Sequence, residues 1–306
     1  PSSPSGVDGE PFRMRSIDLG PLYNISMVGC NADCVAQVPG AQYADYFVAR
    51  LGINVDAKTG DRLPAPDFSC NLRSWGLVLL RMKDWSTFDL AFVSVLLWPN
   101  DGLDSPNSGS FPQTPIQGGK YVLDSTYDPT VAVLNGELWV SFECAGKGFP
   151  TSSCIGPLAV PDSGIEHASI DLARTTIVVL GTLHAAASVP KIFADRQGRP
   201  VMYFDFFILK PGHIEARAIY LEQESGGARR FFAKGFSDSM PINDESAVRV
   251  WAPHLSHDAL ATNIADVFQV FPSADGRFYF ATAGIGGAGC RAPTASPSGC
   301  YRLAVS

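Results

Sequence analysis

The sequence predicts an all-β fold, a five-bladed β-propeller, on three observations. Apolar runs of strand length alternate with turn signals, aromatic residues gather in those runs, and one hairpin pattern recurs about five times. The chain has 19 Phe, 9 Tyr and 5 Trp, which favour strands, and 29 Gly and 23 Pro, which supply turns. With 46% hydrophobic and 17% charged residues, the composition is that of a folded chain with a large core.

The recurring pattern is clearest in three segments, each with a β-branched run, a tight turn and an aromatic strand. A Gly in the turn favours hairpins, because both central residues need positive φ. The segments are 128–146, 188–207 and 265–284, with turns at Asn135-Gly136, Gln197-Gly198 and Asp275-Gly276.

Two looser hairpins begin near residues 24 and 75, so the five expected starts lie near 24, 75, 128, 190 and 266. Spacings of roughly 50 to 75 residues suit four-stranded blades. Three further segments, beginning at Ala168, Thr176 and Ile214, are expected as outer strands. A β-sandwich is the alternative fold, but a sandwich does not require one hairpin to recur. We therefore expect one domain over residues 1–306, with a flexible tail at about 1–10.

Seven cysteines indicate an oxidising compartment. Cys144 and Cys154 are ten residues apart across a Gly-rich stretch, and Cys290 and Cys300 are ten apart across another. Both pairs are expected to form disulfides that close flexible loops. Cys30, Cys34 and Cys70 remain, so one thiol is expected to be free; Cys30 could pair with Cys34 or Cys70, and the sequence leaves this pairing open. The cysteine spacings predict no metal site.

Charge and hydropathy exclude several classes of partner. The net charge is −7 and no Lys or Arg run exceeds two residues, which disfavours nucleic acid and anionic membranes. No apolar run approaches the roughly 20 residues of a membrane span. The first residue is Pro1, in a Pro/Ser-rich stretch, from which we expect that a signal peptide was removed. The expected protein is a secreted or periplasmic monomer.

The Asp128-Pro129-Thr130-Val131 run, the Gly turns and the Trp251-Ala252-Pro253-His254 run resemble the five-bladed propeller glycoside hydrolases, both arabinanase/xylosidase-type and invertase-type. The resemblance covers about half of the chain. It implies acidic residues on the inner strands and a catalytic Glu beyond them. The first hairpin departs from this pattern, because Asn24 stands where an Asp is expected.

The inner strands of a propeller converge on an axis, so residues that open them are candidates for a central site. Glycoside hydrolysis needs two carboxyl groups across the sugar, one donating a proton and one acting as base or nucleophile. Asp128 is the candidate base or nucleophile, Glu166 the candidate acid, and Asp205 a residue that tunes the acid or holds a hydroxyl. Each has a structural alternative: a turn-capping Asp, a solvated loop Glu and a solvent-facing strand Asp.

Further residues are candidates for binding substrate, and the sequence does not decide between these roles and structural ones. A solvent-facing strand position is the favoured alternative for Lys191. Trp139 is expected to pack in the core. The candidates for substrate binding are Asn24, Trp75, Glu143, Lys191, His254 and Asp266.

Two classes of function remain open at this point. One is a secreted glycoside hydrolase that needs no cofactor, with a structural Ca²⁺ conceivable on loop oxygens. The other is a non-enzymatic propeller that binds a glycan or a protein, and other propeller enzymes such as lactonases or lyases form a third group. The inner-strand residues differ from blade to blade, which favours one asymmetric site over a repeated lectin site.

Overall fold

The structure is a computed structural model. It describes residues 17–18, 23–25, 35–53, 75–86, 89–97, 114–208, 213–237, 239–242, 248–251, 264–272, 278–284 and 300–305. Within these ranges the regular elements are strands and short 3₁₀ helices, and no helix there is long and apolar enough to cross a membrane. The all-β prediction is confirmed.

The strands form four antiparallel sheets that follow one another along the chain. Sheet 1 contains, in order, β1 (Ile17–Asp18), β2 (Tyr23–Ile25), β4 (Tyr46–Ile53), β5 (Trp75–Asp84) and β6 (Asp89–Leu97), with β3 (Val35–Gln37) beside β4. Sheet 2 contains, in order, β11 (Ser169–Ile170), β10 (Phe149–Ala159), β9 (Glu137–Lys147), β8 (Tyr121–Leu134) and β7 (Thr114–Ile116), with β12 (Thr176–Val179) beside β10.

The other two sheets have the same meander. Sheet 3 contains β13 (Ala185–Ala194), β14 (Pro200–Ile208), β15 (His213–Gln223) and β16 (Phe231–Ala233), with β17 (Val248–Trp251) beside β15. Sheet 4 contains β18 (Ile264–Pro272), β19 (Phe278–Gly284) and β20 (Cys300–Val305). The predicted outer strands are confirmed as β11, β12 and β15.

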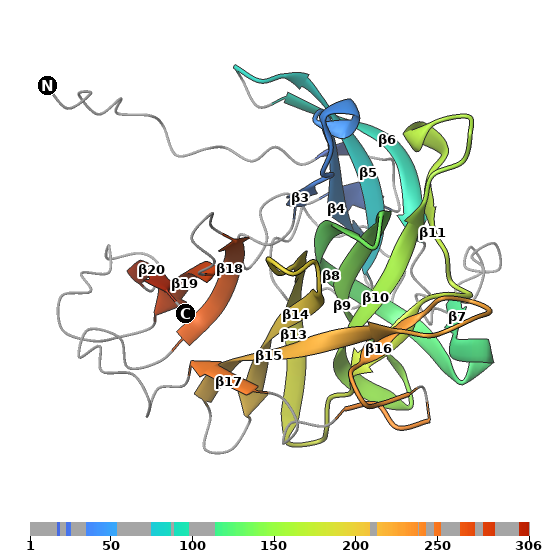
Figure 1. The fold of residues 1–306 in the computed structure, drawn as a ribbon. Helices are drawn as coiled ribbons and strands as arrows, with labels where there is room; N and C mark the ends of the chain where they lie inside the picture. The colour runs from blue at the N-terminus through green and yellow to red at the C-terminus, as the bar shows by residue number, and fades with distance from the viewer. Residues whose placement is uncertain are drawn as a thin grey trace, which may run out of the picture.

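Each sheet packs on the next one along the chain. Strand β8 contacts β4 and β5, β13 contacts β8, and β18 contacts β13. Figure 1 shows the sheets following one another around an arc, from sheet 1 to sheet 4. Successive face-to-face sheets of this kind are the blades of a propeller, whereas a sandwich has two sheets. The propeller prediction is confirmed, and the described residues form four blades.

One detail of the predicted repeat is wrong. The hairpins that start near residues 24 and 75 do not form separate blades, because β2 pairs with the end of β4 and β4 pairs with β5. Strand β2 is only three residues long, so it extends the sheet of its neighbour. The predicted turn at Asn135-Gly136 is confirmed, with φ of 50° and 82° at its two central residues.

Sheet 2 has an apolar core on each face. Along β9, Val140 and Phe142 pack against sheet 1 residues such as Leu77, while Trp139 packs against sheet 3 residues such as Phe204. This alternation follows from the two-residue period of a strand. Trp139 is fully buried, as expected for a core residue. The residues of β9 that share its face, Ser141 and Glu143, therefore also point toward sheet 3.

The Cys144–Cys154 disulfide is confirmed, but it does not close a flexible loop. Strands β9 and β10 run up to a turn at Gly148, and Cys154 lies opposite Phe142 in their register. Both cysteines are fully buried in the core between sheets 1 and 2. Glycine and proline suggested a loop, yet Gly146 lies within β9 at a position where a Cβ would meet the Val122 carbonyl.

The other cysteines of interest are Cys30, Cys34, Cys70 and Cys290, which lie outside the described residues, and Cys300, at the start of β20.

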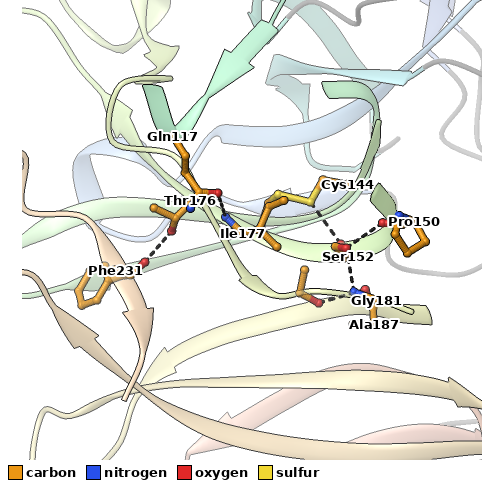
Figure 2. Close-up of a disulfide and its surroundings, with 11 residues drawn as sticks. Gln117, Cys144, Pro150, Ser152, Thr176, Ile177, Gly181, Ala187 and Phe231 are labelled. Atoms are coloured by element: carbon orange, nitrogen blue, oxygen red, sulfur yellow. Dashed lines mark hydrogen bonds between the residues drawn. A yellow bond between two sulfur atoms is a disulfide. The ribbon is translucent and has the colours of Figure 1, made fainter. Parts of the chain in front are cut away.

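Hydrogen bonds connect the segments around the disulfide, as Figure 2 shows. The Ser152 hydroxyl donates to the Pro150 carbonyl at 2.7 Å and accepts from the Gly181 amide at 2.9 Å. The Thr176 hydroxyl donates to the Phe231 carbonyl at 2.6 Å, which links sheet 2 to sheet 3. These bonds satisfy backbone groups that the short strands leave without ladder partners.

Candidate functional site

Asp128 lies on a β-bulge in the middle of β8. Tyr127 pairs with Glu143 and Thr130 pairs with Ser141, so Asp128 and Pro129 together lie opposite the single residue Phe142, as in a β-bulge. The Asp128 φ is 46°, in the left-handed region, although the residue before a proline normally adopts an extended conformation. A strained backbone of this kind gathers at functional sites, where the surrounding structure maintains it.

A second bulge with the same chemistry lies in β13. Ser188 pairs with Asp205 and Lys191 pairs with Tyr203, so Val189 and Pro190 together lie opposite the single residue Phe204. The Val189 φ is 47°, which is unusual for a β-branched residue. Both bulges thus consist of a left-handed residue followed by proline. The recurrence supports the predicted equivalence of the segments at 128 and 188.

The two bulges are joined by hydrogen bonds. The Pro190 carbonyl accepts from the Thr130 hydroxyl at 3.1 Å and from the Ser141 hydroxyl at 2.9 Å. The Thr130 hydroxyl in turn accepts from the Ile192 amide at 3.3 Å, and the Val189 amide donates to Glu143 Oε2 at 3.3 Å. The first strands of sheets 2 and 3 are therefore fixed to each other at the level of Asp128.

The Asp128 carboxylate is buried and lies near two cations, Arg50 and Lys191. Its Oδ1 lies 3.9 Å from Arg50 Nη1 on β4, and the two side chains are 9% and 6% exposed. Burial raises the pKa of Asp128 above its ordinary value, and the positive charges of Arg50 and Lys191 oppose that rise. Three sheets thus contribute to one charge cluster, with Arg50 from sheet 1, Asp128 from sheet 2 and Lys191 from sheet 3.

Other carboxylates lie on the strands next to this cluster. Asp205 is fully buried on β14, and the register places it two residues from the partner of Lys191, on the same face of sheet 3. Glu143 reaches the β13 bulge through its bond to the Val189 amide. Glu215 is buried and accepts a hydrogen bond from Arg217 Nε at 3.0 Å. Arg217 also lies over the Phe206 ring, 4.5 Å from its centroid.

Two structural alternatives weighed from the sequence are wrong. Lys191 and Asp205 do not face solvent, since they are 3% and 0% exposed. The alternation of side chains along a strand suggested that one face of the sheet is exposed to solvent. In this structure other sheets cover both faces of the blade, so the side chains on the second face are buried as well.

Glu166 lies apart from the cluster. It sits in the 3₁₀ helix η5 (Ile165–His167), and its side chain is 51% exposed. It accepts a hydrogen bond from the Tyr46 hydroxyl at 2.9 Å and pairs with Arg81 at 3.4 Å. Tyr46 precedes Arg50 by four residues on β4, a separation of about 13 Å along the strand. The structure thus brings Lys191 and Glu143 to the level of Asp128, places Asp205 on the face of sheet 3 that Lys191 shares, and places Glu166 elsewhere.

The remaining candidates are placed only by their backbone or not at all. Asn24 pairs with Gly52 in sheet 1, Trp75 begins β5, and Asp266 lies in β18. His254 lies outside the described residues, as does the predicted tail at 1–10. Among the residues that the structure describes, no group of three or more His, Cys, Asp and Glu side chains is arranged to hold a metal ion.

Arg50 is a member of the cluster that the sequence reasoning missed. Its signal was a single cation within the apolar strand 46–53, where a fully buried charge needs a partner. Arg217, in the strand 213–223, shares its strand with Glu215, with which it forms an ion pair. A charged residue at the centre of an otherwise apolar strand is therefore a sequence signal for a buried charge cluster.

Comparisons with known proteins give matches only among solved structures. No protein-family model and no curated protein matches the chain. An endo-arabinase from Bacteroides thetaiotaomicron is 10% identical, with a TM-score of 0.44 over 85% of this chain and 70% of its own. A family-43 endo-arabinanase from Bacillus licheniformis is 9% identical, with a TM-score of 0.45 over 85% and 68%. A β-fructofuranosidase from Microbacterium saccharophilum is 8% identical, with a TM-score of 0.46 over 90% and 57%. Arabinanases and a β-fructofuranosidase are thus among the solved structures to which this chain is similar.

Proposed function

We propose that this protein is a glycoside hydrolase whose reaction takes place at the charge cluster around Asp128. The observation that carries the proposal is a buried carboxylate on a strained pre-proline bulge, where the first strands of sheets 2 and 3 meet. A strained, buried acid between two cations costs stability, which is typical of a group retained for its chemistry.

Asp128 acts as the base or nucleophile in this proposal. Asp128 Oδ1 accepts no hydrogen bond from the described residues, so it is available to a water or to a sugar carbon. In an inverting reaction it takes a proton from water, whereas in a retaining reaction it attacks the sugar directly. Arg50 and Lys191 favour the ionised form of Asp128, which either role requires.

The second carboxyl is Glu143 or Asp205, in place of the exposed Glu166. Glu143 lies opposite Tyr127 in the β8–β9 register and contacts the β13 bulge, so it lies at the level of Asp128. Asp205 shares a face with Lys191, whose charge acts on Asp128. One of these groups donates a proton to the leaving oxygen.

The experiment is a screen of neutral and acidic polysaccharides, followed by variants assayed on whichever substrate is cleaved. Asp128→Asn keeps the shape and removes the charge, so we expect a loss of roughly 10²- to 10⁴-fold in kcat/KM. Glu143→Gln and Asp205→Asn identify the second carboxyl, and Glu166→Gln is the matched control with near wild-type activity. Unchanged turnover in Asp128→Asn would remove this residue from the mechanism. Binding without cleavage across the panel would favour a non-enzymatic glycan-binding propeller.

The compartment follows from the cysteines. We propose a secreted or periplasmic protein, which the Cys144–Cys154 disulfide supports because such bonds persist in oxidising environments. We also propose that the protein is a monomer and that it acts on carbohydrate without a cofactor.

A further inference from the structure

A pocket of about 700 Å³ lies at the β8–β9 turn of sheet 2, against the segment that joins β3 to β4 in sheet 1. This volume is in the range of small-molecule sites. Sheet 1 contributes Gln42 and Tyr43, from the 3₁₀ helix η2 (Ala41–Tyr43). The polar lining on the other side comprises Glu137, His167, Ser169 and Arg174.

The pocket is separate from the charge cluster. Its lining includes Val133 and Gly136, which follow Asp128 by five and eight residues along β8 and its turn. At about 3.3 Å per residue, Val133 lies about 16 Å beyond Asp128. A ligand in this pocket therefore does not occupy the proposed catalytic site.

A rigid ion pair forms part of the wall. Arg174 donates from Nη2 to Glu137 Oε2 at 2.7 Å and from Nη1 to Glu137 Oε1 at 3.4 Å. The Arg174 guanidinium also lies over the Trp139 ring, 5.0 Å from its centroid. Because Trp139 is fully buried, its ring is a fixed surface for the Arg174 guanidinium. The ion pair is therefore already ordered before a ligand binds, which lowers the entropy cost of binding.

The lining suits a neutral polyol. Glu137 and Arg174 neutralise each other while offering both donors and acceptors, and Gln42 and Ser169 add amide and hydroxyl groups. Tyr43 supplies an aromatic surface, and three prolines, Pro39, Pro157 and Pro161, add apolar surface. An anionic ligand needs a cation without a carboxylate partner, and an apolar ligand would leave the ion pair desolvated.

We infer that this pocket binds a neutral oligosaccharide at a site distinct from the Asp128 cluster. Sugar C–H groups pack on Tyr43 and the prolines, and sugar hydroxyls bond with Glu137 and Arg174. The inference goes beyond the proposed function, because a sugar binds there whether or not Asp128 cleaves it. In the active enzyme such a site retains a polysaccharide chain next to the reaction.

The test measures binding in the Asp128→Asn background, so that no substrate is consumed. Affinity electrophoresis against neutral polysaccharides and polygalacturonate selects a ligand, and calorimetry with its oligosaccharides gives Kd. Tyr43→Ala removes the aromatic surface, and Ser169→Trp fills the pocket from an exposed position. Tyr220→Ala is the matched control, since Tyr220 is a 40% exposed tyrosine on β15, away from the pocket. Far-UV circular dichroism confirms that each variant is folded.

We expect Kd to rise roughly tenfold in Tyr43→Ala, binding at the pocket to disappear in Ser169→Trp, and Kd to stay unchanged in Tyr220→Ala. Equal affinity in wild type and both pocket variants would overturn the inference, as would binding of polygalacturonate alone or of no glycan at all. If Asp128→Asn cleaves as well as wild type while Tyr43→Ala loses binding, the proposed function fails and the pocket stands.

Discussion

At the scale of single residues, Asp128 combines three properties that are individually uncommon. It is buried, it has a left-handed backbone before a proline, and it lies between two cations from neighbouring sheets. The sequence predicted its position because Asp128-Pro129 opens a β-branched run. The sequence did not predict the cluster, since Arg50 and Lys191 are 78 residues before it and 63 after it in the chain. Long-range pairing of charges has no local signal.

Burial of Asp128 makes a prediction about pH. Its pKa in the folded state is raised above 3.8, so the folded state binds the proton more tightly than the unfolded state does. The stability that this proton provides is complete below the unfolded value and is lost as pH rises through the folded pKa. Asparagine does not ionise, so the Tm of Asp128→Asn minus that of wild type should increase with pH.

The measurement is thermal unfolding of both proteins between about pH 4 and about pH 8 at constant ionic strength. Ser237→Ala, on an exposed turn, provides the control, because this change removes no ionisable group and should give a constant difference. A difference for Asp128→Asn that stays flat over this range would contradict the burial argument.

At the scale of elements, polar groups hold the strands as much as apolar ones do. Thr130 and Ser141 share the Pro190 carbonyl, and the Ser153 hydroxyl donates to the Ala187 carbonyl at 3.2 Å. The Pro190 carbonyl lies in the β13 bulge and the Ala187 carbonyl lies just before it, where the sheet register is broken. Hydroxyls of sheet 2 thus replace ladder bonds that the bulge removes. Hairpin patterns predicted the strands, but they contain no information on which hydroxyl meets which carbonyl.

The hydroxyl contacts can be measured by denaturation. Ser141→Ala and Thr130→Val leave the Pro190 carbonyl short of one donor each, and we expect each to cost about 1 to 3 kcal/mol of the free energy of unfolding. The double variant should cost less than the sum, because the two hydroxyls also contact each other at 2.6 Å and each single variant already breaks that contact. Ser237→Ala, at an exposed turn, is the control, and we expect it to change the free energy of unfolding by close to zero. Additive losses would show that the two hydroxyls act independently.

The disulfide makes a second prediction at this scale. Its cysteines are ten residues apart, for which the loop-entropy relation gives about 2.7 kcal/mol of stabilisation. The Cys144→Ala/Cys154→Ala variant should therefore lower the urea midpoint without changing the m-value greatly. Peptide mapping without reduction checks the bond itself, and free thiols at both positions would refute it.

At the scale of the whole molecule, sheet 2 lies between two cores. One core contains residues of sheets 1 and 2, and the other contains residues of sheets 2 and 3. The alternation of apolar residues and the Gly turns predicted this fold class well, because they act within each hairpin. The number of hairpins per blade was less predictable, since β2 joins β4 through contacts that no local pattern encodes.

Shared cores predict cooperative unfolding of sheets 1 to 3. Loss of sheet 2 exposes apolar surface of both neighbours, so no sheet of the three should unfold alone. Urea titrations followed by far-UV circular dichroism and by Trp fluorescence should coincide, with Trp139 reporting on the inner core. Two separated transitions would show that the blades unfold independently.

The joint between sheets 2 and 3 has a consequence for how this chain tolerates substitution. Its acceptors are main-chain carbonyls of Ala187 and Pro190, which almost any residue also carries. The donors, by contrast, are side-chain hydroxyls that only Ser or Thr supplies at Thr130, Ser141 and Ser153. A complete substitution scan should therefore be strict for the hydroxyls on the sheet 2 face, whereas these bonds set no requirement on the side chains of Ala187 and Pro190. The hydrogen bonding of this joint thus depends on the side chains of one blade only.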